Sequence, residues 1–140
     1  AVIPKWVSAM ITDDIVTING DGLTTRDFCY VANAVQANIR AALAPDEAQG
    51  EVYNVAVGDR TSLLDLFQLL QNGLAHHQVH YHRDPVMGPF RRGDVRDTQA
   101  SIEKAGRLLD YSPTHNLAQG LDDALPWYLN FFLAEASPAA

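Results

Sequence analysis

The sequence predicts an α/β fold in one soluble domain, and three observations support this prediction. Segments with the apolar spacing of helices alternate with short runs that have the spacing of strands. The chain has 140 residues, of which 47% are hydrophobic, so it can bury the core of one ordinary domain. No apolar run approaches the roughly 20 residues of a membrane-spanning helix. We therefore expect a soluble protein, located in the cytoplasm, with no membrane partner.

The first half of the sequence predicts two helices with a strand between them. Apolar residues recur at helical spacing over 3–11, and 15–18 has the composition of a short strand that ends at the turn Asn19-Gly20-Asp21-Gly22. Residues 27–31 are apolar enough for a strand or an extended segment. The alanine-rich stretch 32–43 predicts a packed helix, which Pro45 and Gly50 close.

The second half predicts two further strands and three helices. Residues 51–57 alternate well enough for a buried strand, and Thr61 or Ser62 can cap a leucine-rich helix whose apolar positions include 63–70. Residues 79–82 predict another strand, and 84–93 a loop, because it contains two prolines and a glycine. Helices are expected at 100–109 and 117–132, with a break at 111–113 between them.

Two segments far apart in the chain each place an arginine beside an aspartate and a flexible glycine. They are 20–28, which contains Arg26 and Asp27, and 90–94, which contains Arg91 and Asp94. A guanidinium group matches the planar fork of phosphate oxygens and stays charged at any working pH. We interpret the two segments as halves of one diphosphate clamp. The net charge of -7, with no basic run, excludes a nucleic-acid partner.

The motifs together resemble a known family. They are Ala1-Val2-Ile3-Pro4-Lys5-Trp6, Ile18-Asn19-Gly20-Asp21-Gly22, Thr25-Arg26-Asp27-Phe28-Cys29-Tyr30-Val31, Val52-Tyr53-Asn54-Val55-Ala56-Val57-Gly58 and Arg91-Arg92-Gly93-Asp94-Val95-Arg96. In order and spacing they resemble the C-terminal substrate-binding half of extended short-chain dehydrogenase/reductases, which belong to the NAD(P)-binding Rossmann-like superfamily. Within these, they are most similar to UDP-N-acetylhexosamine (GlcNAc/GalNAc) 4-epimerases, relatives of UDP-galactose 4-epimerase.

The resemblance implies a division of labour between two halves of a parent enzyme. In the family, the N-terminal half binds NAD and carries the catalytic Ser/Thr and Tyr-x-x-x-Lys residues, and this sequence contains neither that tyrosine motif nor a G-x-G-x-x-G turn. The chain is therefore expected to be inactive alone, to bind no cofactor and to pack on its missing N-terminal half. Residues 1–133 would be the substrate-binding portion and 134–140 a flexible tail. The parent would be a homodimeric isomerase, with polysaccharide biosynthesis as the expected route.

The resemblance also implies roles for charged residues. Arg26 would contact a phosphate of UDP, Arg91 would contact the same diphosphate from the other side, and Asp94 would accept hydrogen bonds from the ribose hydroxyls. Two structural alternatives remain open. Arg26 and Asp27 could pair with each other or cap a turn, and Arg92 could take the phosphate role in place of Arg91.

Four further residues would border the uracil, by the same resemblance. Val2 would offer backbone groups beside Ala1, and Trp6 an apolar wall, although Trp6 on an apolar helix face could equally belong to the core. Thr17 stands where the most similar relatives carry an aromatic residue, so stacking on the base at this position is in doubt. Gly20-Asp21-Gly22 is better interpreted as a tight turn than as a phosphate nest.

The remaining features have structural interpretations. Cys29, between two aromatic residues, is expected to be a buried and inert thiol in a reducing compartment. The histidines at 76, 77, 80 and 82 fit a solvated face better than a metal site, because no thiolate or fixed carboxylate accompanies them. Leucines of 63–70 are expected in the core. The aromatic cluster of 127–132 could pack on the missing half and leave an exposed patch here.

Two other functions fit the same residues. Nucleotide-sugar dehydratases and decarboxylases share the Arg-Asp-aromatic and Arg-x-Gly-Asp patterns, so the chain could be half of such an enzyme. It could also be a stand-alone nucleotide-sugar binding module with no catalytic parent. The residues do not choose among UDP-sugars.

Overall fold

The computed structural model describes residues 1–136 and divides them into two compact units, each built from separate stretches of chain. Unit 1 comprises Ala1–Thr24, Ser62–Arg96 and the residues from Leu121 onward, and unit 2 comprises Thr25–Thr61 and Asp97–Gly120. The substrate-binding portion predicted over 1–133 stays a prediction. No helix of the described residues is long and apolar enough to span a membrane.

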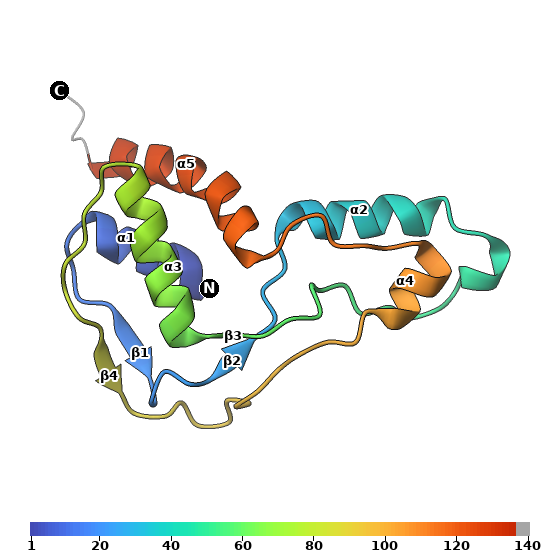
Figure 1. Ribbon diagram of the computed structural model, residues 1–140, viewed down its shortest axis with the longest axis horizontal. Helices are drawn as coiled ribbons and strands as arrows, with labels where there is room; N and C mark the ends of the chain where they lie inside the picture. The colour runs from blue at the N-terminus through green and yellow to red at the C-terminus, as the bar shows by residue number, and fades with distance from the viewer. Residues whose placement is uncertain (137–140) are drawn as a thin grey trace. The chain divides into compact units, whose positions relative to one another are not determined.

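Unit 1 packs helices beside a two-stranded parallel sheet (Figure 1). Its elements are α1 (Val2–Ile11), β1 (Thr17–Asn19), α3 (Leu63–His76), β4 (Val86–Gly88) and most of α5 (Leu117–Ala136). The core is apolar and includes Trp6, Val7, Met10, Val16, Ile18, Leu66, Phe67, Leu70, Leu74, Tyr81, Leu121, Leu125 and Leu129. Phe67 joins two parts of this core, because its ring meets those of Trp6 and Tyr81 edge-on at 6.4 and 6.1 Å.

Helix α3 begins where the sequence predicts. In α3, the hydroxyl of Ser62 accepts a hydrogen bond from the Asp65 amide at 3.1 Å and donates one to the Asp65 carboxylate at 2.6 Å. This reciprocal cap satisfies an amide that the first helical turn leaves without a partner. α3 also lies close to α5, because a Cβ at Gly73 would come within 2.5 Å of Leu125. The predicted core role of the leucine-rich helix is confirmed.

The strand predicted at 79–82 is wrong, and part of the loop predicted at 84–93 is β4. β4 pairs in parallel with β1, with Thr17 opposite Val86 and Asn19 opposite Gly88. The ladder starts after Pro85, which has no amide hydrogen to donate. Residues 79–82 are instead held by side chains. The hydroxyl of Tyr81 accepts from the Val16 amide at 3.2 Å and donates to the Asp14 carbonyl at 2.9 Å, and the side-chain amide of Gln71 donates to the Tyr81 carbonyl at 2.7 Å.

Unit 2 contains β2 (Thr25–Arg26), α2 (Val31–Ala42), a short 3-10 helix η1 (Asp46–Ala48), the first residue of β3 (Thr61–Ser62) and α4 (Glu103–Leu109). Its core is small and alanine-rich, consisting of Ala37, Ala48, Ala105, Leu109 and Tyr111. The buried Tyr111 hydroxyl donates to the Ala56 carbonyl at 2.7 Å. Burial raises the pKa of Tyr111 to about 12, because the apolar surroundings disfavour the phenolate.

The buried strand predicted at 51–57 is wrong, since no strand forms there in the described chain. Val52 is 84% exposed, so the alternating pattern does not correspond to one buried face. A strand needs a neighbouring backbone to complete its ladder, and here side chains take those groups instead. The ammonium group of Lys104 donates to the Val52 carbonyl at 3.0 Å, and the hydroxyl of Tyr111 donates to the Ala56 carbonyl at 2.7 Å.

Cys29 is exposed, so the prediction of a buried thiol is wrong. It lies in the link between β2 and α2, where no strand forms, and its thiol donates to the Tyr30 carbonyl at 3.7 Å. Partial desolvation still raises the pKa of the Cys29 thiol above its ordinary value. The thiol therefore stays protonated near neutral pH, as the inert interpretation requires.

The C-terminal region follows the prediction with shifted ends. α4 begins three residues later than predicted and ends at Leu109 as expected, followed by Asp110 in a left-handed conformation with φ of 53°. α5 begins at Leu117 as expected and continues past 132 to Ala136. The first three residues of the predicted flexible tail are thus helical, and the rest of that tail lies outside the described residues.

Candidate functional site

Residues Arg91 to Asp94 form a tight turn in unit 1. The amide of Asp94 donates to the Arg91 carbonyl at 3.2 Å, and Gly93 has a φ of 79°. A positive φ at the third of four residues is the signature of a type II turn, in which glycine avoids a steric cost. Arg91 and Asp94 are therefore the two ends of one turn, and both are exposed. An arginine and an acceptor-only carboxylate can contact neighbouring parts of one ligand.

Residues 20–22 form the expected tight turn at the end of β1. One carboxylate oxygen of Asp21 accepts from the amide of Leu23 at 3.0 Å, which fixes the turn through a side chain. Gly20 has a φ of 75°, and a Cβ at this position would overlap the ring of Phe90. The glycine is therefore required both by the backbone conformation and by the close approach of Phe90.

The two turns of unit 1 are joined by Asp21, Arg96 and Phe90, which we call the Asp21–Arg96–Phe90 cluster. The second carboxylate oxygen of Asp21 accepts from the guanidinium of Arg96 at 2.5 Å. Arg96 also lies over the ring of Phe90, 5.4 Å from its centroid. The hydrogen bond from Arg96 and the bond from the Leu23 amide lower the pKa of Asp21 below its ordinary value.

The parallel pairing of β1 and β4 explains why these distant residues meet (Figure 1). Parallel strands end at the same edge of a sheet, so the residues after Asn19 and after Gly88 leave β1 and β4 together. The amide of Gly20 donates to the Gly88 carbonyl at 3.0 Å, which extends the contact by one residue. Phe90 and Asp21 follow immediately.

Arg26 lies in unit 2, whereas the other predicted site residues lie in unit 1. Arg26 is half-buried, and its guanidinium donates to the carbonyl of Thr25 at 2.7 Å. The predicted phosphate contact of Arg26 stays a prediction.

Asp27 braces three segments of unit 2. Its carboxylate accepts from the amides of Val57 and Gly58 at 3.0 Å each, and from the amide of Ala100 at 3.3 Å. Backbone hydrogen bonds to an ionised carboxylate are among the stronger ones in proteins. This arrangement matches the alternative in which Asp27 caps a turn.

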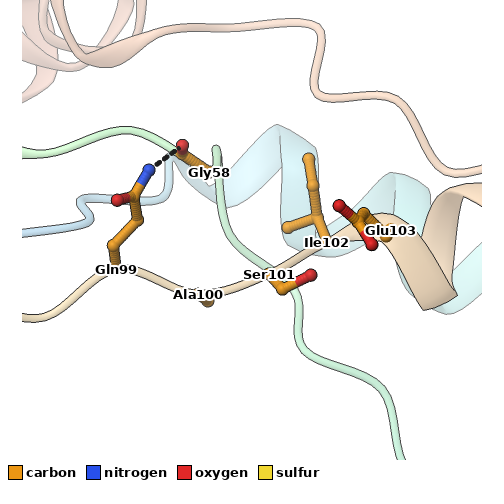
Figure 2. Close-up of a pocket in the computed structure, with 6 residues that line it drawn as sticks. All are labelled: Gly58, Gln99, Ala100, Ser101, Ile102 and Glu103. Carbon is orange, nitrogen blue, oxygen red and sulfur yellow. Dashed lines mark hydrogen bonds between the residues drawn. The ribbon is translucent and has the colours of Figure 1, made fainter.

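Two of the shallow hollows of unit 2 lie beside this brace. One is lined by Asp27, Asn54, Val55, Ala56, Asp97, Thr98, Gln99 and Ala100. The other, drawn in Figure 2, is lined by Gly58, Gln99, Ala100, Ser101, Ile102 and Glu103. The side-chain amide of Gln99 donates across it to the Gly58 carbonyl at 2.5 Å. Only acidic side chains carry charge in either lining, so neither hollow complements a phosphate.

The four predicted uracil neighbours lie on α1 and β1 of unit 1. Ala1 is exposed at the helix start, Val2 is half-buried, and Thr17 is exposed at the first position of β1. Trp6 is only 3% exposed and packs against Phe67, as the core alternative expected. Its role as a ligand wall stays a prediction.

The described residues contain no group of three or more His, Cys, Asp or Glu able to hold a metal ion. His80 and His82, two of the residues considered for such a site, stack with their ring centroids 6.2 Å apart. The sequence analysis missed the partnership of Asp21 with Arg96. Nothing local could have revealed it, because the two residues are 75 positions apart.

The fold places this chain in a structural class. It has the α/β fold of part of the extended short-chain dehydrogenase/reductases, since structures of nucleotide-sugar epimerases superpose on nearly all of it. Residues 1–56 match a family model described as the NAD dependent epimerase/dehydratase family.

Proteins similar to this chain include two UDP-sugar epimerases and one UDP-sugar decarboxylase. The chain is 31% identical to UDP-glucose 4-epimerase from Thermotoga maritima, solved with UDP-glucose, with a TM-score of 0.81 over 98% of this chain and 40% of that one. It is 27% identical to UDP-N-acetylglucosamine 4-epimerase from Methanobrevibacter ruminantium, solved with UDP-N-acetylmuramic acid, with a TM-score of 0.80 over 94% of this chain and 40% of that one. It is also 26% identical to UDP-N-acetyl-alpha-D-glucosaminuronate decarboxylase from Bacillus cytotoxicus, over 91% of this chain and 39% of the relative. The chain thus spans about two fifths of the length of each.

Proposed function

We propose that this chain binds the UDP part of the substrate in an NAD-dependent UDP-N-acetylhexosamine 4-epimerase and has no independent catalysis. The observation that carries the proposal is the turn with Arg91 and Asp94 at its two ends, in a chain similar to UDP-sugar epimerases. A diphosphate and a ribose are adjacent in UDP. One turn that offers a guanidinium and a carboxylate is therefore suited to contact both.

The proposal assigns each contact separately. Arg91 contacts the diphosphate, Asp94 accepts from the ribose hydroxyls, and Arg26 of unit 2 makes its own contact with a phosphate. Ala1 and Val2 border the uracil through exposed or half-buried positions at the start of α1.

NAD belongs to the proposed parent enzyme and not to these residues. A dinucleotide pyrophosphate is held by a glycine-rich turn between a strand and a helix, and the sequence has no such turn. The residues of this chain therefore do not fit NAD, and no hydride-transfer step is assigned to them.

A decarboxylase or dehydratase parent is the second candidate, favoured by the similarity to the glucosaminuronate decarboxylase. Such an enzyme would hold the same UDP group, so the contacts proposed above do not separate the two. The sugar separates the two candidates, because a decarboxylase substrate carries a carboxylate where an N-acetylhexosamine carries a hydroxymethyl group. Assays of the parent enzyme with both UDP-sugars would distinguish the candidates by the product formed.

The test on this chain is a titration with UDP-N-acetylglucosamine, followed through amide shifts by NMR. We expect shifts at Arg26, Arg91 and Asp94, and weaker binding in Arg26→Ala and Arg91→Ala. Arg40→Ala is the matched control, because Arg40 is a partly exposed arginine of unit 2 whose partner is Asp110 at 2.5 Å. Equal binding by all the variants would contradict the proposal, and a loss on Arg92→Ala alone would transfer the phosphate role to Arg92.

A further inference from the structure

The turn that carries Arg91 and Asp94 is bracketed by two residues that touch each other. Phe90 precedes the turn and Arg96 follows it, and the guanidinium of Arg96 lies 5.4 Å from the centre of the Phe90 ring. The five residues between them are therefore closed into a short loop. A short closed loop samples far fewer conformations than an open one of the same composition.

Both ends of this loop are also fixed to the turn after β1. The ring of Phe90 fills the place that a Cβ at Gly20 would occupy, and Arg96 donates to the carboxylate of Asp21 at 2.5 Å. Asp21 is held in turn by the amide of Leu23 at 3.0 Å. Phe90 and Arg96 are therefore both attached to the turn that directly follows β1 of the β1–β4 sheet.

We propose that Asp21 and Arg96 are positioning residues, which hold the Arg91–Asp94 turn in its ligand-binding arrangement before the ligand arrives. This inference rests on the proposed UDP contacts of Arg91 and Asp94. Immobilising flexible side chains and loops on binding costs affinity, so a turn that is already ordered binds more tightly. Asp21 and Arg96 act through the turn and touch no part of UDP themselves.

The cluster is partly open to solvent, which limits its strength. The side chains of Arg96 and Asp21 are 46% and 41% exposed, and an ion pair of that kind is weak and screened by salt. Its contribution to the global stability of the chain is therefore expected to be small. Its effect on a five-residue loop is expected to be larger, because no strand or helix holds those residues.

Two measurements on the same variants test the inference. Backbone 15N relaxation of the ligand-free chain reports the order of Arg92 to Val95, and a UDP titration reports affinity. We expect Asp21→Asn and Arg96→Gln to lower the order parameters of these amides and to weaken UDP binding about three- to tenfold. Arg96→Lys keeps a cation over Phe90, so it should restore part of both.

The matched control is Asp13→Asn. Asp13 is another exposed aspartate of unit 1 and pairs with Arg83 at 2.6 Å, in the turn after α1. Its substitution should leave both the loop order and UDP affinity unchanged. If Asp21→Asn and Arg96→Gln behave like this control in both measurements, the positioning role is overturned while the proposed UDP site stands.

The two measurements also separate the two proposals. If the unaltered chain does not bind UDP, the proposed function fails for this chain, and the ligand-free relaxation data decide the positioning role without it. A loop of unchanged order in Asp21→Asn then overturns the positioning role. A loop that loses order supports it.

Discussion

The carboxylate of Asp27 accepts a hydrogen bond from the backbone amide of Gly58 at 3.0 Å, although the two residues are 31 positions apart. The amides of Val57 and Ala100 donate to the same carboxylate. The aspartate that follows Arg26 thus fastens the segment bearing this arginine to two other segments of unit 2. Asp27 therefore holds three loop segments of unit 2 together.

Asp27→Asn should lower the free energy of unfolding by about 1–3 kcal/mol, because an amide offers one acceptor oxygen where the carboxylate offers two. Urea denaturation measures the change. Asp59→Asn is the control, since the Asp59 carboxylate accepts from the amide of the adjacent Arg60 at 2.7 Å and so bridges no distant segments through this bond. Equal effects of the two substitutions would show that Asp27 is not a brace.

Gly20→Ala should destabilise the chain more than Gly50→Ala. Both glycines have a positive φ, 75° and 71°, which costs an alanine about 1–2 kcal/mol. The new methyl group at Gly20 also meets Phe90, whereas nothing lies within 4 Å of the same position at Gly50. Unfolding in urea would measure both. In a Phe90→Ala background, the extra cost of Gly20→Ala should disappear, and its persistence would refute the packing explanation.

Because of Tyr111, the free energy of unfolding should fall as the pH rises from about 10 to about 12. The unfolded tyrosine loses its proton near its ordinary pKa of 10.0, whereas the folded one retains it to about 12. The folded state therefore binds more protons in this range, and its stability falls with pH until both states are ionised. Tyr111→Phe should remove this pH dependence from urea unfolding curves. Identical pH profiles for the two proteins would contradict the assignment.

Substitutions at two nearby positions of α5 should differ greatly in their cost to stability. Trp127 is 61% exposed and stacks on Phe131, whereas Leu125 is 1% exposed in the core. Leu125→Ala should cost about 2–5 kcal/mol of unfolding free energy, and Trp127→Gln less than about 0.5 kcal/mol. Trp127→Gln should also reduce self-association at high concentration, measured by sedimentation. A large stability loss for Trp127→Gln would mean that its ring is part of the core.

Helices were predictable here because their signals are local. Ser62 and the leucines that follow it predict the start of α3 within a few residues, and the structure confirms this helix. Strands depend on a partner that is often distant in sequence, so the alternation over 51–57 predicted a strand where side chains such as Lys104 take the backbone groups. β4 was missed for the same reason: only its pairing with β1 makes a proline-bounded segment a strand.

The candidate site also contains features that a local pattern predicts and features that depend on pairing between distant residues. The turn at Arg91–Asp94 follows from four consecutive residues, in which Gly93 supplies the required backbone conformation. The contact of Asp21 with Arg96 depends on the parallel register of β1 and β4, which no local pattern encodes. The exposure of Cys29 was missed because its aromatic neighbours suggested burial, while the segment forms no strand.

The most direct test of the central claim compares the affinity of this chain for UDP and for uridine, by calorimetry, before and after Arg91→Ala. If Arg91 contacts the diphosphate, UDP should bind more tightly than uridine, and Arg91→Ala should weaken UDP binding while leaving uridine binding unchanged. Equal affinities for UDP and uridine in the unaltered chain, or equal losses for both ligands in the variant, would contradict the account.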